Sequence, residues 1–533
     1  MSTTGETGTE QSESPAPPDQ QWHAPYNPWL ISGVATLTTF MEILDTTIVI
    51  VALPHIAGDL GVSQDASTWI VTAYLLSNAV VLPFSPFMSS LFGRRNFYLA
   101  CVVLFTLSSL LCGLAPSFGL LVVFRLLQGL AGGGLQPSTQ AILVDTFPEH
   151  KRGMAMAMFG LVVVIAPAIG PTLGGWITDN FNWRWIFLIN IPVGFISLLL
   201  ASKFITDPPY LPRRKGADRF KIDYVGFVLI VLGLGGIQIT LSIAERKGWF
   251  ESPTIVMLAV GSAIAIIVAI WWELRHKDPL VNLRLLKERN LGATVCLFVL
   301  FGFGFYGSMV MFPLFLQGLL GYTPTWSGLA VSPGGIVMVF MMPIVGLLVM
   351  RFDPRKLVVL GLVILSIALY KMSYFNLDTD FRTIVTTRML QSFGISMIFV
   401  PLNTMAYTYV AREMRNSASS LISLGRNTGA SIGIAFVANA IARHGQVQQS
   451  HLVQHITPFA PQYNAYVNQL HKILTAISGD SVQALAQAQA ITYNLLQQQS
   501  MALAFSDVYR ILSFMVLILL PFVFIIRKPN IQR

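Results

Sequence analysis

Charged side chains are scarce in this chain: Asp, Glu, Lys and Arg together make up 11% of its 533 residues. Soluble globular domains carry about 25%. Hydrophobic residues reach 54%, and apolar runs of 18 or more residues recur along the chain. Each such run is long enough to cross a bilayer as a helix. The composition therefore excludes a soluble globular protein and predicts an all-α integral membrane protein.

Cysteine is nearly absent as well. Cys101, Cys112 and Cys296 all lie in apolar runs and show neither paired spacing nor a C-x-x-C motif, so the sequence supports neither a disulfide framework nor a zinc site. His451 and His455 have the i, i+4 spacing of paired metal ligands, but no third ligand accompanies them. We expect no bound metal.

Two signatures of enzymes are missing: the phosphate-binding G-x-x-x-x-G-K-[ST] loop and the H-E-x-x-H motif of zinc proteases. No soluble stretch is large enough to house a catalytic domain. Without the phosphate loop, the chain has no ATPase of its own to drive transport. A membrane receptor or enzyme remains the alternative from another functional class, because signalling leaves no sure mark in a sequence.

Lys and Arg are absent from the first 27 residues, which are rich in Ser, Thr, Pro and Gly. We interpret 1–27 as a disordered cytoplasmic tail. A secretory signal would need a basic start and a short apolar core, whereas the first apolar run here is full length and carries acids. We expect this run to insert the chain as its first span.

That first span, residues 29–54, contains Glu42 and Asp45 near its middle. Their i, i+3 spacing places both acids on one face of a helix. An ionisable group at bilayer depth costs about 2.5–3.5 kcal/mol, so such residues face a bundle interior or a water-filled path. Later apolar runs hold Arg125 and Arg388. Buried acids and bases together predict a proton or ion pathway; the alternative is a structural ion pair that only fixes helix register.

The chain repeats itself at an offset of about 260 residues: the R-L-L-Q of Arg125–Gln128 matches the R-M-L-Q of Arg388–Gln391. Parallel six-span repeats are one plan of membrane transporters, with the substrate site between the halves. We count fourteen spans, which are two six-helix bundles plus two extra central spans. The predicted parts are an N-terminal bundle (28–205), the two extra spans with their linkers (206–290), spans nine to thirteen (291–442), an extracytoplasmic insertion (443–504), and the last span with a cytoplasmic tail (505–533).

Basic residues are unevenly divided between the two sides of this topology. Of the 34 Lys and Arg residues, 23 lie on the side of the termini, 8 on the opposite side and 3 within spans. Because cytoplasmic loops accumulate positive charge, both termini are predicted to be cytoplasmic. The same distribution explains the net charge of +9 without a nucleic-acid partner.

Three stretches resemble a known group, the EmrB-type fourteen-span drug:proton antiporters of the major facilitator superfamily. They are L-D-T-T-I-V-I-V-A-L-P (44–54), R-L-L-Q-G (125–129) and A-P-A-I-G-P-T-L-G-G (166–175). The resemblance implies proton coupling at Asp45 and proton transfer at Arg125, with Glu42 beside them. It also implies an antiporter motif in span five. The residues expected to control conformational change are Gly93, Arg94, Arg95, Pro167, Gly170, Pro171, Gly174, Gly175, Arg388 and Arg426.

The same resemblance implies the function: proton-coupled efflux of small lipophilic or amphipathic compounds across the bacterial inner membrane by alternating access. The proton gradient would replace any cofactor. Export of one specific metabolite, such as a siderophore or a fatty acid, on the same fold is the alternative that the sequence leaves open.

One motif departs from the superfamily pattern. The loop after span two usually reads G-x-x-x-D-x-x-G-R-R, but here Pro86 and Ser90 replace the first Gly and the Asp. The acid that usually helps to close the cytoplasmic side is therefore missing. We expect Arg94 or Arg95, paired with Asp145 or Glu149, to take its place.

Several further residues within spans could line a substrate cavity or merely bond neighbouring helices. An aromatic and Met-rich ninth span would suit lipophilic substrates. The candidates for the cavity are Gln128, Gln317, Phe305, Tyr306, Asn403 and Tyr407.

The insertion at 443–504 is rich in Gln and predicts a helical hairpin. The resemblance implies that it contacts a periplasmic EmrA-like membrane-fusion adaptor and, through it, a TolC-like outer-membrane channel. The alternative is a hairpin that only caps its own exit or lies on membrane lipid.

Overall fold

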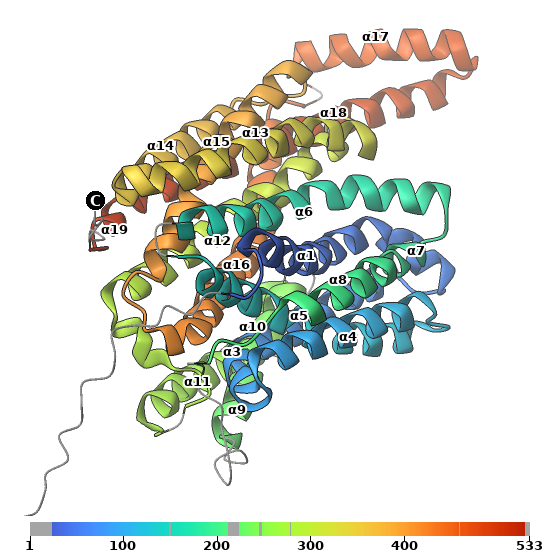
Figure 1. Ribbon diagram of the computed structural model, residues 1–533. Coiled ribbons are helices and arrows are strands. Elements are labelled where there is room, and N and C mark those ends of the chain that lie inside the picture. The colour runs from blue at the N-terminus through green and yellow to red at the C-terminus, as the bar shows by residue number, and fades with distance from the viewer. Residues whose placement is uncertain are drawn as a thin grey trace, which may run out of the picture.

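The computed structural model describes residues 24–148, 151–209, 211, 223–244, 248–277, 279–457 and 459–527. Within these ranges every regular element is a helix (Figure 1). The N-terminal tail predicted at 1–27 lies almost entirely outside the described residues.

The first half of the chain forms one bundle of six spans, with the sixth span broken into two helices. Its elements are α1 (Pro28–Asp59), α2 (Gln64–Ser67), α3 (Trp69–Phe92), α4 (Arg94–Gly113), α5 (Phe118–Thr146), α6 (Arg152–Asn180), α7 (Trp185–Leu188) and α8 (Asn190–Phe204). The second half forms the other bundle with α12 (Arg289–Gly318), α13 (Pro324–Arg351), α14 (Pro354–Met372), α15 (Phe381–Ala406), α16 (Arg415–Val453), α17 (Pro461–Ser478), α18 (Ser481–Ile518) and α19 (Leu520–Val523).

The two extra spans lie between the halves in sequence. They comprise α9 (Tyr224–Ile230), the π-helix η3 (Val231–Gly235), α10 (Gly236–Ile243) and α11 (Pro253–Arg275), with short 3₁₀ turns at η4 (Trp249–Glu251) and η5 (Leu283–Lys287). A third 3₁₀ turn, η6 (Arg412–Met414), lies in the second half between α15 and α16. η3 and α10 pack against α3 of the first half, and α10 also packs against α16 of the second. The first extra span therefore lies at the seam between the two bundles, and α11 packs against that span.

Twelve described helices are long and apolar enough to span a bilayer on their own. The helix α6 adds a span that is bent by 41° after Pro167, which is the effect expected of Pro in a helix interior. The helix α14 has 19 residues with basic residues at both ends and packs between α15 and α18. The described chain thus has fourteen spans.

The two halves meet along α6 with α13 and along α3 with α16.

Trp29, at the start of α1, packs its ring against Phe147 just after α5, with centroids 5.1 Å apart. In the second half, Arg355 donates to the carbonyl of Ile526 at 3.2 Å. Both ends of the described chain lie at one end of the bundle, which we call the terminal end; the opposite end is the far end.

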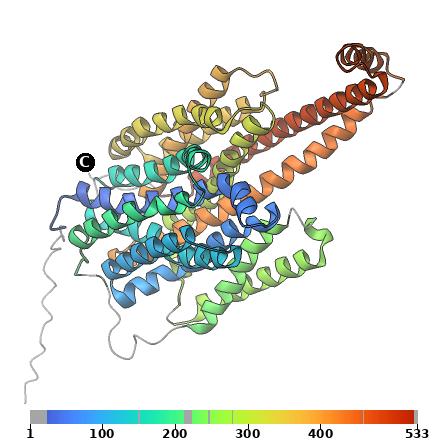
Figure 2. The same ribbon diagram turned by 90° about the vertical axis from the view of Figure 1, so that its right-hand side faces the viewer.

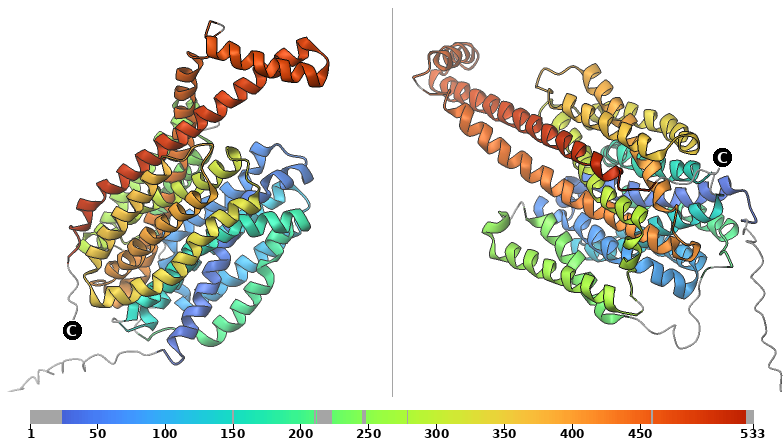
Figure 3. Two further views of the ribbon diagram at one scale, coloured as in Figure 1. Left: turned by 90° about the horizontal axis from the view of Figure 1, so that it is seen from above. Right: turned by 90° about the vertical axis from the view of Figure 1, so that its left-hand side faces the viewer.

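The helices α16 and α18 extend beyond the other helices at the far end, where α17 joins them (Figures 2 and 3). The helical prediction for the insertion agrees with this, but the predicted boundaries at 442 and 504 do not, because α16 runs unbroken to Val453 and α18 runs unbroken from Ser481 into the last span. Near the base of the projection, Gln448 of α16 donates to Asp507 of α18 at 2.8 Å. The projection is therefore a direct continuation of two spans.

Candidate transport site between the two halves

Asp45 of α1 lies in a closed network of polar side chains. Its Oδ2 accepts from Arg125 Nη1 at 2.6 Å, and its Oδ1 accepts from Gln128 at 3.0 Å and Asn190 at 2.7 Å. The side chains of Asp45 and Arg125 are both 0% exposed. Two buried opposite charges with further hydrogen bonds form a stable pair, and removing one partner alone is costly. The structure joins Asp45 to Arg125 in a buried ion pair, and in this conformation it seals both from water.

Glu42, one turn earlier, has different surroundings. Its carboxylate accepts from Gln136 at 2.7 Å, Tyr74 at 3.0 Å and Asn78 at 3.3 Å. None of these donors is charged, and no basic group of the described residues lies within salt-bridge distance of it. Glu42 is 2% exposed, but it is one of the residues that line a cavity between the halves, whereas Asp45 is not.

Tyr74 connects the two carboxylates. Its hydroxyl donates to Glu42, and the guanidinium of Arg125 lies 4.5 Å from the centre of its ring, within the range of a cation–π contact. Arg125 in turn binds Asp45. The side chain of Tyr74 therefore contacts both the Glu42 carboxylate and the Asp45–Arg125 ion pair, so a change of charge at Glu42 can act on that pair.

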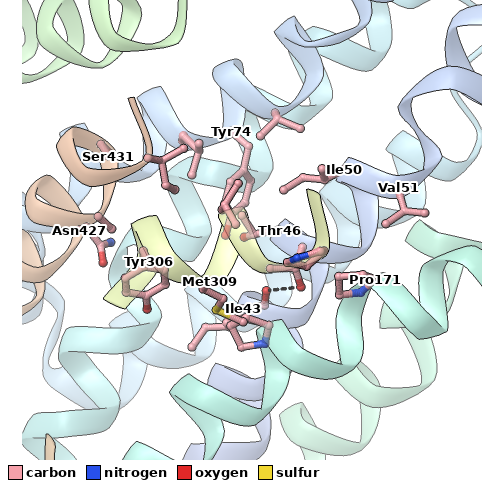
Figure 4. Close-up of a pocket in the computed structure, with 18 of the residues that line it drawn as sticks. Ile43, Thr46, Ile50, Val51, Tyr74, Pro171, Tyr306, Met309, Asn427 and Ser431 are labelled. Carbon is pink, nitrogen blue, oxygen red and sulfur yellow. Dashed lines mark hydrogen bonds between the residues drawn. The ribbon is translucent and has the colours of Figure 1, made fainter. Parts of the chain in front are cut away.

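The cavity has a volume of about 890 Å³ and lies between the halves. Figure 4 shows Tyr74, Thr46 and Ile50 of the first half facing Tyr306, Met309 and Asn427 of the second. Most of its wall is apolar, as is typical of sites for drug-sized molecules. Its lining includes His55 and Asp179, close to the ends of α1 and α6. The cavity therefore reaches toward the far end.

Two of the predicted cavity residues, Tyr306 and Gln317, lie on its wall. The other four predicted cavity residues do not. Gln128 belongs to the Asp45 network, Phe305 packs its ring on Phe301, Asn403 donates to the carbonyl of Phe399, and Tyr407 bonds Ser419 and Gln140. In this conformation Gln128 and Tyr407 bond neighbouring helices, whereas the cited contacts of Phe305 and Asn403 lie within their own helices.

Four polar partners of the acids were missed in the sequence: Tyr74, Asn78, Gln136 and Asn190. All four lie within apolar spans, and Tyr74 and Asn78 have the i, i+4 spacing of one helix face. Gln136 follows Gln128 by about two helical turns on the same helix. This spacing was the available signal, because polar residues at bilayer depth face the bundle interior.

The comparisons with known proteins agree with this architecture. The family model described as Major Facilitator Superfamily matches residues 35–434. The chain belongs to the major facilitator superfamily. Among its relatives, the "Multidrug export protein EmrB" of Haemophilus influenzae is 35% identical over 445 residues, covering 83% of this chain and 86% of that protein. The "Fatty acid resistance protein FarB" of Neisseria gonorrhoeae is 33% identical and covers 92% and 95%.

Solved structures of the superfamily share the fold at low sequence identity. The human organic anion transporter MFSD10 superposes with a TM-score of 0.58 at 15% identity, covering 92% of this chain and all of that one. The proton:xylose symporter XylE gives 0.57 at 13% identity, covering 93% and 95%. The relatives place the chain in the EmrB-type group of the superfamily.

In this superfamily member, the predicted antiporter motif of α6 packs against α1 beside the two acids. A Cβ added at Gly174 would lie 2.7 Å from the carbonyl oxygen of Ile48, and one at Gly170 would lie 2.1 Å from the hydroxyl of Thr47. Only glycine allows helices to approach this closely. Pro171 and Gly175 of the same motif line the cavity. The motif therefore fixes how α6 lies against the proton-coupling candidates.

Ion pairs and close backbone contacts join the two halves at the terminal end. Asp145 of α5 accepts from Arg94 at 2.6 Å and from Arg415 of the second half at 2.5 Å. A Cβ added at Gly153 would lie 2.8 Å from the carbonyl oxygen of Gly346, again across the halves. The bundle is thus closed at this end and hollow toward the far end.

The expected pairing of Arg94 with Asp145 is confirmed. Arg95 instead donates its backbone N–H to Asp207 at 2.7 Å and its guanidinium to the carbonyl of Ser202, and Glu149 lies outside the described residues. Ser90, at the position of the missing acid, donates to the carbonyl of Phe87. The contact across the halves therefore uses an acid on α5 in place of one in the loop.

The letters G-x-S-x-G of a hydrolase nucleophile elbow occur at Gly429–Gly433. They lie inside α16, whereas an elbow requires a sharp turn from strand to helix. A Cβ added at Gly429 would lie 1.9 Å from the carbonyl oxygen of Val299 on α12. The pattern serves close helix packing, in line with a transporter fold.

Proposed function

We propose that this protein is a proton-coupled exporter that removes lipophilic or amphipathic compounds across the bacterial inner membrane by alternating access. The observation that carries the proposal is Glu42, a carboxylate on the wall of an apolar cavity between the two halves that forms no ion pair with the residues that the structure describes. A group so placed can exchange a proton with the cavity and compete with a bound substrate. The names of the EmrB relatives support the same function.

The distribution of basic residues supports a cytoplasmic location for both termini. With that orientation the terminal end faces the cytoplasm, and the Arg94–Asp145–Arg415 contact closes it. The cavity then opens away from the cytoplasm, which is the state that releases an exported compound. The proton gradient supplies the free energy for transport, and the proposed mechanism uses no cofactor.

The test is transport by the purified protein in proteoliposomes. With an imposed gradient, acid inside, inside-out molecules are expected to accumulate a lipophilic cationic dye in the vesicles against its concentration gradient. Dissipating the gradient with an ionophore is the matched control and should stop accumulation. Equal accumulation with and without the gradient would contradict proton coupling.

A second cargo, a fatty acid, has one specific observation in its favour. The relative from Neisseria gonorrhoeae covers nearly the whole chain and is named a fatty acid resistance protein. Multidrug export remains the better supported proposal, because several relatives carry that name.

We further propose that the projection of α16, α17 and α18 docks a periplasmic EmrA-like adaptor and, through it, a TolC-like outer-membrane channel. It carries apolar side chains in the open, among them Ile477, 78% exposed, and Val482, 81% exposed. Such a surface away from the bilayer suits a protein partner.

Deleting residues 446–500 tests this partner. A Cβ added at Gly445 would lie 2.9 Å from the sulfur of Met501, so a short Gly-Ser linker can join the cut ends without moving either span. We expect transport in proteoliposomes to stay near the wild-type level, while resistance in cells falls at least about tenfold. The double substitution Ile477→Asp, Val482→Asp, which keeps the helices, should act in the same direction. Equal losses in vesicles and in cells would instead indicate a role in folding or in the exit.

A further inference from the structure

The network around Asp45 has a counterpart in the second half. An offset of 263 residues relates Arg125 to Arg388 and Gln128 to Gln391. In both halves the Arg donates to the Gln three residues later. Gln128 then donates to Asp45 at 3.0 Å, and Gln391 donates to Ser308 at 2.9 Å.

The same offset relates Asp45 to Ser308 itself. The second half has therefore kept the guanidinium and the amide of the network but has a hydroxyl where the first half has its carboxylate. Glu42 has no acidic counterpart either, because the offset leads to Phe305. The acids of the pseudo-symmetric pair of networks are all in the first half.

Arg388 is consequently a buried cation without a counter-charge. The residue is 3% exposed, its Nε has no hydrogen-bond partner, and no carboxylate of the described residues forms an ion pair with it. The ring of Phe312, 5.3 Å from its guanidinium carbon, offers only a cation–π contact. A buried ion that lacks a partner costs several kcal/mol, so an external anion at this position would be strongly favoured.

Arg388 also lines the central cavity, together with apolar side chains of the same region such as Met309, Leu314 and Val331. A guanidinium beside an apolar wall matches a molecule with a carboxylate at one end and a hydrocarbon body. The volume of about 890 Å³ is within the range of sites that enclose a drug-sized molecule.

We propose that Arg388 is the binding position for the carboxylate of an amphipathic acid, which supplies the partner that Asp45 supplies to Arg125 in the first half. This inference rests on the proposed export function and names a substrate class for the same cavity. The hydrocarbon part of the ligand lies along the apolar wall. Gln391 accepts from the guanidinium of Arg388 and donates to Ser308, and these hydrogen bonds fix the position of the guanidinium.

The test is equilibrium binding to the purified protein, which needs no proton gradient and so can fail or succeed independently of the transport assay. The probes are a saturated fatty acid and the fatty alcohol of the same chain length, and the measured quantity is the ratio of their affinities. We expect the wild type to bind the acid at least about tenfold more tightly. The variant Arg388→Gln should bring the ratio close to one, and Arg388→Lys should retain part of it.

The variant Ser308→Asp gives the sharper test, because it keeps Arg388 and supplies the missing acid from within the chain. It should also bring the ratio close to one. A ratio that stays at the wild-type value in Arg388→Gln, whether or not both affinities fall, would overturn the proposal. The proposal would also be overturned if the wild type showed no preference for the acid. That result would mean that Arg388 binds either an inorganic anion such as chloride or no anion.

Discussion

The substitution Asp45→Asn is expected to abolish gradient-driven export while the protein still folds. Asp45 neutralises Arg125 at 2.6 Å in a site without solvent. Without that carboxylate, the guanidinium is a buried charge without its partner and is separated from Glu42 by Tyr74, so we expect it to disturb proton exchange at Glu42. Removing one partner of a buried ion pair also costs about 3–5 kcal/mol, so a lower melting temperature should accompany the loss. The measurement is dye accumulation in proteoliposomes under an imposed pH gradient.

The double variant Asp45→Asn, Arg125→Gln shows which property of Asp45 matters. If Asp45 acts by balancing Arg125, removing both charges should restore most of the thermal stability and part of the gradient-driven transport. Undiminished coupling in Asp45→Asn alone would refute any role of this residue in coupling. Recovery of stability without any transport would mean that Asp45 itself carries the proton.

The substitution Glu42→Gln is expected to uncouple transport from the proton gradient. Glu42 is the carboxylate of the first span that lines the cavity, and its three hydrogen-bond donors are neutral. The only buried cation of the described residues that its charge balances is Arg426, which it reaches through Gln136. We expect a modest stability loss of about 1–3 kcal/mol, because the new amide must share a site built from donors. Movement of the dye down its own gradient should continue, whereas accumulation against it should stop.

Gln136 links this site to the second half and offers a matched control. It donates to Glu42 at 2.7 Å and accepts from Arg426. The variant Gln136→Leu leaves the titratable carboxylate in place and removes the link. If coupling needs only the carboxylate, this variant should keep more of its gradient dependence than Glu42→Gln.

Much of the architecture follows from the sequence because membrane spans are specified locally. Apolar length and the internal repeat sufficed for fourteen spans in two bundles with two extra helices, and the i, i+3 spacing of Glu42 and Asp45 sufficed to turn both acids inward. The expected insertion boundaries differ from the structure because a Gln-rich stretch also favours helix, so nothing local ends α16 at 442.

The different surroundings of Glu42 and Asp45 could not be predicted from the sequence. Both lie on one face of α1, and only the partners from other helices separate them: Asn190 and Arg125 close over Asp45, while Gln136 and Tyr74 leave Glu42 beside the cavity. Such contacts depend on how helices pack in three dimensions. The same reason explains why Gln128, expected in the cavity, belongs to a closed network.

The acid that is missing from the loop after span two is replaced by an acid on another helix. Ser90 cannot pair with a base, but Asp145 lies where two arginines, one from each half, reach it at 2.6 and 2.5 Å. The sequence indicated the pair with Arg94. It did not indicate the pair with Arg415, because Arg415 and Asp145 are 270 positions apart and belong to different bundles.

The account depends most on Glu42 as the carboxylate that exchanges a proton with the cavity when substrate binds. The direct measurement is proton release from the purified, weakly buffered protein on addition of a lipophilic cation, followed with a pH indicator. Wild type should release about one proton per bound cation, and Glu42→Gln should bind the cation with no release. Release that persists in Glu42→Gln but disappears in Asp45→Asn would contradict the account and move the exchanging site to Asp45.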